Sequence, residues 1–109
     1  MRNLTPHAIT ISVNGVVNTI QPSGVIARVS TTEQSAGLCP VTYAPVIRRT
    51  FGDVENIGSP SDGPCLVSSI VLSALGSEWR GVAFAPDTGD TAIRDSKGMI
   101  IAVTRLVTV

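Results

Sequence analysis

Hydrophobic and polar residues alternate over the first thirty positions of the chain, a pattern typical of β-strands that bury one face. We expect strands at residues 7–13, 16–20 and 25–30. Asn14-Gly15 separates the first two, and these residues accept the positive φ that a two-residue hairpin turn requires. The turn sets Val16 opposite Val13. The pattern therefore predicts an antiparallel β-meander in this part of the chain.

After residue 30 the alternation is interrupted by glycines, prolines and polar residues. We expect loops at residues 31–39 and 52–64, and strands at residues 41–51, 65–67, 79–86, 91–95 and 99–109. Pro45 cannot donate to a ladder, so its strand is expected to lie at a sheet edge or to bend there. The last strand is apolar and at a sheet edge would tend to pair with other chains, so we expect it to be central or paired with another subunit.

Residues 68–76 are the one stretch that favours a helix. Ser68 or Ser69 suits the N-cap and Gly76 suits the C-terminal cap. A continuous strand is the alternative for this stretch. The elements together predict a mainly β (α+β) fold, built from an antiparallel meander and hairpins with one short helix near residues 68–76. A chain of 109 residues is expected to form a single domain, residues 1–109.

Composition supports a sheet-rich fold and suggests self-association. Val (14), Ile (10) and Thr (11) far outnumber the six Leu, and β-branched residues favour strands. The chain has only four aromatic residues, so the core of one copy is expected to be small. Eight basic and eight acidic residues give no net charge to oppose association. We therefore expect a homo-oligomer.

Charge and motifs exclude several classes of protein. Zero net charge argues against a nonspecific nucleic-acid binder, which needs a basic surplus. No segment approaches the roughly 18 apolar residues of a membrane span, and the first residues lack the apolar core of a secretion signal. We expect a cytoplasmic protein without a membrane partner. Cys39, Cys65 and the single histidine match no metal motif, so no metal or cofactor is expected.

Seven of the eight basic residues are arginines, whose planar guanidinium suits phosphate and carboxylate groups. Arg105 shares an alternating face of the last predicted strand with Val, Ile and Met, so it needs a partner there. Asp87, Asp90 or Asp95 would supply a salt bridge, and a carbonyl or a ligand anion is the alternative. Arg28 lies on the polar face of the third predicted strand, where it is either solvated or lines a groove that an oligomer covers.

Two further positions combine a structural and a functional interpretation. His7 shares its predicted face with Ile9 and Ile11, which is typical of a hydrogen-bonded core histidine. As an acid or base it would need an orienting carboxylate and a nucleophile, and the sequence marks neither. Ser68 and Ser69 stand where a strand opens into a helix, so they either cap that helix or present hydroxyls and backbone N–H groups to an anion.

Three segments of the chain carry a resemblance to known proteins. Asn3-Leu4-Thr5-Pro6-His7-Ala8-Ile9 resembles the start of small bacteriophage and prophage proteins. Residues 22–29 resemble their second block, and residues 93–101 their closing block. The resemblance implies a viral or prophage origin and the cytoplasm of an infected or lysogenic host cell, with no particular activity. It marks as signature positions Asn3, Thr5, His7, Arg28, Arg94 and Asp95.

We expect a non-enzymatic phage accessory protein, homo-oligomeric, that binds and sequesters a small anionic nucleotide-like ligand and so acts against a host defence signal. Such a pocket needs arginines for phosphates, hydroxyls for ribose and an aromatic wall for the base. The aromatic candidates are Tyr43, Phe51, Trp79 and Phe84. The predicted ligand-binding residues are Asn3, Thr5, His7, Arg28, Ser68, Ser69, Arg94, Asp95 and Arg105.

Two alternatives stay open. One is a protein-binding inhibitor or structural accessory that acts through an exposed strand edge or its loops. The other is an enzyme acting on phosphodiesters, with His7 as the acid or base.

Overall fold

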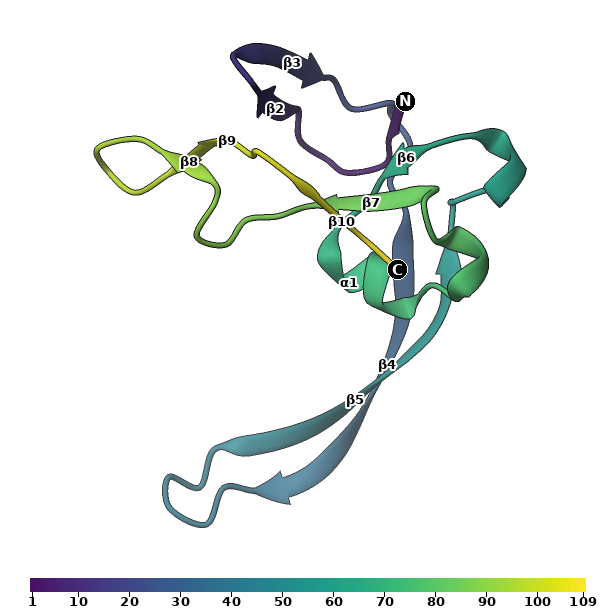
Figure 1. Cartoon of the computed structure of the whole chain (residues 1–109). Coiled ribbons are helices and arrows are strands. Elements are labelled where there is room, and N and C mark those ends of the chain that lie inside the picture. The colour runs from purple at the N-terminus through teal and green to yellow at the C-terminus, as the bar shows by residue number, and fades with distance from the viewer.

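A computed structural model describes all residues, 1–109, and shows a sheet-rich body from which one long hairpin projects (Figure 1). The strands are β1 (Arg2–Asn3), β2 (Ile9–Val13), β3 (Val16–Ile20), β4 (Arg28–Leu38), β5 (Pro45–Glu55), β6 (Cys65–Leu66), β7 (Ala83–Pro86), β8 (Ile93–Arg94), β9 (Ile100–Ala102) and β10 (Leu106–Thr108). The helices are α1 (Ser69–Ala74) and two single 3₁₀ turns, η1 (Pro60–Asp62) and η2 (Ser77–Trp79). The predicted mainly β fold with one short α-helix is confirmed.

The body is built on a four-stranded sheet in the order β1-β6-β7-β10. β6 pairs in parallel with both β1 and β7, whereas β10 pairs antiparallel with β7. The buried face of β7 carries Ala83 and Ala85, whose small side chains leave room for α1 above the sheet. Trp79 and Val71 pack into the same core. The core is small, because only 15 of the 109 residues are buried.

The first hairpin is confirmed in its register. Val13 lies opposite Val16 and Ile9 opposite Ile20, and Asn14 and Gly15 adopt φ values of 51° and 82°. The predicted meander is wrong beyond it, because β4 pairs with β5 and not with β3. Backbone hydrogen bonds from Ser23 N to Asn3 O and from Ala27 N to Leu4 O tie the intervening segment to β1 instead.

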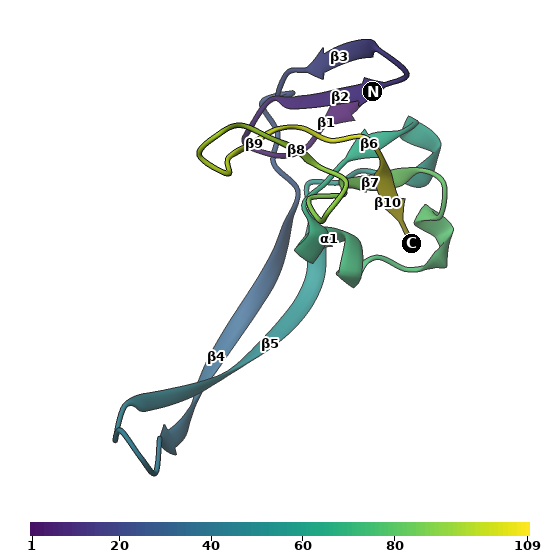
Figure 2. The same ribbon diagram turned by 60° about the vertical axis from the view of Figure 1, so that its left-hand side comes forward.

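β4 and β5 form a two-stranded ribbon, which we call the arm (Figure 2). The loop predicted at residues 31–39 is therefore wrong, and residues 52–55 of the second predicted loop also belong to a strand. Both faces of the distal arm are exposed, so its strands need none of the alternation that marks a half-buried strand. Pro45 stands at the first residue of β5, where a missing N–H is tolerated.

The arm makes the molecule extended. The principal extents of the whole molecule are 51 × 40 × 24 Å. The Cα radius of gyration is 16.9 Å, against about 13 Å for a compact chain of this length. From Thr31 to Asp53, every residue except Cys39 is exposed.

The long apolar strand predicted at residues 99–109 is two strands with different partners. Around Val103 the chain hydrogen-bonds to β2, through Ser12 N to Val103 O and Val103 N to Thr10 O. Beyond Arg105 it moves to β7 as β10, which is an edge strand, so the expected central position is wrong, and pairing with another subunit stays a prediction. The change of partner interrupts the ladder and resets which side chains face the body.

The helix predicted at residues 68–76 is confirmed as α1, with Ser68 as its N-cap. Its C-cap is Leu75, and Gly76 has a φ of −80°, so the C-terminal glycine cap is wrong. The chain contains no helix with the length and apolar character needed to cross a membrane.

Candidate functional site

Asn3 and Thr5, two of the signature residues, form a network of hydrogen bonds inside the body. Asn3 is 1% exposed, and its Nδ2 donates to His7 O at 2.8 Å and to Ile20 O at 3.0 Å. Its Oδ1 accepts from Thr5 N at 3.0 Å and from Thr5 Oγ1 at 2.6 Å. The amide has two donors and two acceptor positions, and all four are used within the chain. This geometry explains both residues by their structural role.

His7 does not share the apolar face of the first strand. It lies exposed in the turn before β2, which begins only at Ile9, so the alternation that suggested a core histidine does not extend to it. Its backbone carbonyl accepts the bonds from Asn3 and Thr5, whereas its imidazole forms no hydrogen bond with the rest of the chain. No three His, Cys, Asp or Glu residues gather in a group that could hold a metal ion.

Four of the predicted residues do line one cleft, which we call the His7 cleft. It has a volume of about 390 Å³ and lies between the turn before β2 and the start of α1. Its lining residues are Thr5, Pro6, His7, Ile9, Val67, Ser68, Ser69, Pro86 and Thr88. Arg94 lies beside this cleft, because its Nη2 donates to Thr88 O at 3.0 Å.

A second hollow, the arm groove, lies where the base of the arm meets α1. It has a volume of about 450 Å³ and is lined by Ala27, Arg28, Val29, Thr31, Glu33, Arg49, Phe51, Ser68, Ile70 and Val71. The Arg28 guanidinium has no carboxylate within 4.0 Å and no hydrogen bond to the chain. Phe51 is 59% exposed and extends the groove into an adjoining apolar hollow with Ile70 and Ala74. The arm groove therefore combines an unpaired cation with an exposed aromatic ring.

Arg49 belongs to the arm groove, and the sequence interpretation missed it. Its Nη2 lies 2.8 Å from Glu33 Oε1 across the arm, and both side chains are about half exposed. The pair depends on the register that places Glu33 opposite Arg49. Since residues 31–39 were predicted to be a loop, no cross-strand pairing was available to find it.

Ser68 is the N-cap of α1. Ser68 Oγ accepts from Val71 N at 3.3 Å, and Ser69 O accepts from Ser73 Oγ at 2.9 Å. Capping thus explains Ser68, whereas the Ser69 hydroxyl forms no hydrogen bond with the chain. Ser68 nevertheless lines both the His7 cleft and the arm groove.

Arg94 and Asp95 stabilise the hairpin of β8 and β9. Arg94 Nη1 donates to Gly98 O at 2.9 Å, and Asp95 Oδ1 accepts from Lys97 N at 2.9 Å and Met99 N at 3.0 Å. These bonds hold the turn at residues 96–98, and neither side chain lines a hollow of the body. The closing signature block therefore has a structural explanation too.

Arg105 forms the salt bridge that the sequence predicted, with Asp87. Arg105 Nε lies 2.5 Å from Asp87 Oδ2, and this hydrogen bond lowers the pKa of the Asp87 carboxyl. The side chain of Arg105 is 66% exposed, so its predicted place on an apolar strand face is wrong. The ladder is interrupted at Thr104 and Arg105, which turns the guanidinium outward.

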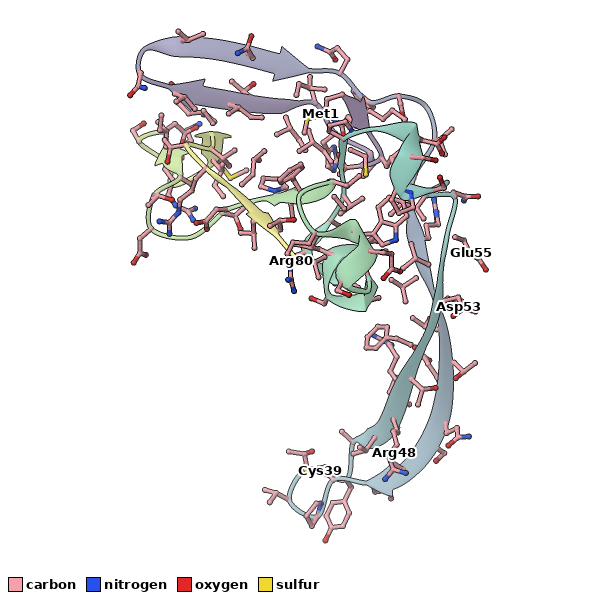
Figure 3. The ribbon with its side chains drawn as sticks, turned by 45° about the vertical axis from the view of Figure 1, so that its right-hand side comes forward. Met1, Cys39, Arg48, Asp53, Glu55 and Arg80 are labelled. Carbon is pink, nitrogen blue, oxygen red and sulfur yellow. The ribbon has the colours of Figure 1, made fainter.

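Three further groups, Arg2, Cys39 and Cys65, lie outside these hollows. The Arg2 guanidinium is partly buried beside η1, where Nη1 donates to Ile57 O at 3.1 Å while Nε and Nη2 are buried without a partner. Cys39 stands at the tip of the arm (Figure 3), and hydrogen bonds from Thr42 lower its thiol pKa to about 7. Cys65 lies in the core, where burial raises the pKa of its thiol.

No protein-family model, curated protein or solved structure matches this chain, so the residues themselves carry the functional argument.

Proposed function

We propose that the protein is a non-enzymatic, homo-oligomeric binding protein that sequesters a small anionic nucleotide-like ligand in the arm groove. The observation that carries the proposal is the unpaired Arg28 guanidinium, which lies in one groove with Phe51 and Ser68. An anti-defence role of phage origin is the biological setting that the resemblance to phage proteins suggests.

The chemistry of the groove suits such a ligand. A guanidinium binds a phosphate through two parallel hydrogen bonds, and Arg28 forms no ion pair, although Glu55 lies opposite it across the arm and Glu33 lines the same groove. Phe51 offers a ring for a base to stack on, an interaction worth about 1–3 kcal/mol per base. The groove volume of about 450 Å³ falls within the usual range of small-molecule sites.

Arg49 supplies a second cation to the same groove. Both side chains of the ion pair between Arg49 and Glu33 are exposed, and exposed pairs contribute little to stability. Arg49 can therefore turn from Glu33 to a ligand phosphate at small cost. His7 lines the other cleft and is not part of this groove, so we propose binding without chemical turnover.

The proposal is tested by calorimetric titration of the intact protein with ADP-ribose and with a cyclic dinucleotide as probes. Arg28→Gln is expected to weaken binding of the bound probe by about tenfold or more, because a charge-assisted hydrogen bond is lost. Arg48→Gln is the matched control, since Arg48 is exposed on the arm but does not line the groove. Equal losses in both variants, or no binding of either probe, would overturn the proposal.

Heating the protein releases the bound probe, and mass spectrometry of the released molecule distinguishes binding from catalysis. A sequestering protein returns the probe unchanged. A cleaved product would instead support an enzyme, and His7→Ala would then be expected to abolish turnover.

A protein-binding inhibitor or structural accessory is the second candidate, and the arm favours it. The free edges of an exposed ribbon can pair with a strand of another protein. In a short-arm variant, residues 36–46 are replaced by Asn-Gly, which joins the paired residues Ser35 and Ile47 by a tight turn. A defined host protein bound in equimolar amount by the wild type and lost from the short-arm variant would favour this candidate.

A further inference from the structure

We infer that the arm is a self-association element, and that its concave side is covered by the concave side of a second copy of this chain. We define the concave side by Ile47 and Phe51 of β5 and Ile70 and Ala74 of α1. The proposal names the surface and the partner of the oligomer. It stands independently of any ligand.

The arm lacks the contacts that would stabilise it in one copy alone. An isolated two-stranded hairpin is marginally stable in water, and the distal arm packs against nothing else in the chain. It also exposes large apolar side chains along its length, namely Leu38, Val41, Tyr43, Val46, Ile47 and Phe51. A ribbon of this kind is expected to gain its stability from another molecule.

One copy exposes more surface than a compact chain of its mass. The accessible surface of one copy is 7172 Å², whereas a compact monomer of 11.3 kDa exposes about 5,700 Å². The excess of about 1,400 Å² exceeds the roughly 800 Å² per partner that a stable interface buries. One copy therefore exposes enough additional surface for a specific dimer.

The register of the arm identifies the side that faces the partner. Residues two apart on a strand share a face, so Ile47, Arg49 and Phe51 point to the same side. Thr31 lies opposite Phe51, and Glu33 opposite Arg49, so these two residues share that side as well. This is the side that lines the arm groove and continues onto Ile70 and Ala74 of α1.

A second copy fits this side in chemistry as well as in area. The chain has no net charge, so two copies do not repel one another as a whole. The groove on this side carries two cations, Arg28 and Arg49, and one anion, Glu33. A two-fold related copy can exchange the partners of the Arg49–Glu33 pair, whereas this exchange leaves Arg28 unpaired. The arm of the second copy would then roof the arm groove, so that groove residues of both copies face one enclosed space.

The test compares the mass of the full-length protein with the masses of two arm variants by analytical ultracentrifugation. The wild type is expected to have a mass of at least twice the 11.3 kDa of one chain at micromolar concentration. Ile47→Lys places a charge on the concave side and is expected to raise the dissociation constant by about tenfold or more. Val46→Lys is the matched control on the opposite side of the same strand, and its effect is expected to stay within about threefold.

The short-arm variant is the second measurement and is expected to be monomeric. Trp79 is buried in the core, which contacts the base of the arm but includes none of the deleted residues 36–46, so its fluorescence shows whether that variant keeps its fold. A monomeric wild type, equal effects of Ile47→Lys and Val46→Lys, or a folded short-arm variant that stays associated would each overturn the inference. None of these outcomes depends on nucleotide binding, so the failure of one proposal is distinguishable from the failure of the other.

Discussion

Replacement of Asn3 by alanine tests whether the most specific signature residue is structural. The change deletes four hydrogen bonds at once. His7 O keeps a donor, since Thr5 Oγ1 still lies 3.0 Å from it. Thr5 N is buried and loses its partner, and Ile20 O loses an amide donor. The damage is therefore concentrated on one buried N–H group and the attachment of the first hairpin.

The magnitude follows from these contacts. The orphaned Thr5 N–H costs about 1–3 kcal/mol and the lost bond to Ile20 O about 1 kcal/mol net, while Thr5 Oγ1 and His7 O keep each other as partners. We expect Asn3→Ala to lower the free energy of unfolding by about 3 kcal/mol in total. For a domain of this size that corresponds to a fall in Tm of roughly 12–20 °C. With only 15 buried residues to support the fold, such a loss is severe.

Urea unfolding followed by the fluorescence of Trp79 measures this loss, because Trp79 is the single tryptophan and is 5% exposed. Protein concentration is held constant, since association raises apparent stability. Asn18→Ala is the control, because Asn18 lies exposed in the same hairpin without a side-chain hydrogen bond, and it is expected to cost less than about 0.5 kcal/mol. A loss below about 1 kcal/mol for Asn3→Ala, together with impaired binding of a nucleotide probe, would refute the structural explanation of this residue.

Three further predictions concern separate parts of the molecule. Arg105→Met removes an ion pair whose guanidinium is exposed and is expected to lower the urea midpoint slightly at neutral pH. Arg105 lowers the pKa of Asp87 in the folded state. The pair therefore stabilises the fold above the usual carboxyl pKa, and this stabilisation is lost as the pH falls through the lowered value. Acid unfolding of the variant is expected to depend less on pH. Thr42→Val removes the main cause of the low thiol pKa of Cys39, and the midpoint of its alkylation by iodoacetamide is expected to rise from about 7 toward 9.0. Ala83→Leu adds bulk to the fully buried face of β7 and is expected to lower the free energy of unfolding in urea by about 1–3 kcal/mol.

Each of these predictions has a contradicting result. An acid limb identical to that of the wild type in Arg105→Met would show that the pair does not couple to folding. Thr42→Ser retains the hydroxyl and is expected to keep the alkylation midpoint, whereas an unchanged midpoint in Thr42→Val would assign the low pKa to other groups. Ala8→Leu, at an exposed alanine, is the control for Ala83→Leu, and equal effects of the two would contradict tight packing beneath α1.

The parts of the fold that were predictable from the sequence are those whose determinants are local. Asn14-Gly15 specifies the first hairpin and its register, and Ser68 specifies the start of α1, because turn and cap chemistry involve only neighbouring residues. A salt bridge of Arg105 was predicted with Asp87, Asp90 or Asp95, and the structure shows it with Asp87, although the apolar strand face that motivated the prediction is wrong. The strand around Arg105 was predicted as continuous, because the exchange of β2 for β7 as its partner depends on the tertiary fold.

The arm and its groove depend on structure that the sequence does not mark locally. Residues 31–39 are polar because the distal arm faces solvent on both sides in one copy, and such a strand shows no alternation. Arg28 and Ser68 were predicted as binding residues, whereas Arg49 enters the same groove only through the pairing of β4 with β5. β1 is two residues long and pairs in parallel with β6, and so short a segment has no periodicity to detect.

The order of the strands in the body has a consequence for how the chain folds as it is synthesised. The first hairpin needs only residues 9–20, and a hairpin of this kind forms in about 1–10 μs. The hairpin can form its backbone hydrogen bonds with Val103 only after that residue has been made. β1 cannot pair with β6 before Cys65 has been made. At about 5–20 residues per second, a ribosome makes Val103 roughly 4–17 s after the hairpin. During that interval the hairpin's apolar face and the unpaired β1 are exposed to other chains, so association between nascent copies competes with closure of the body.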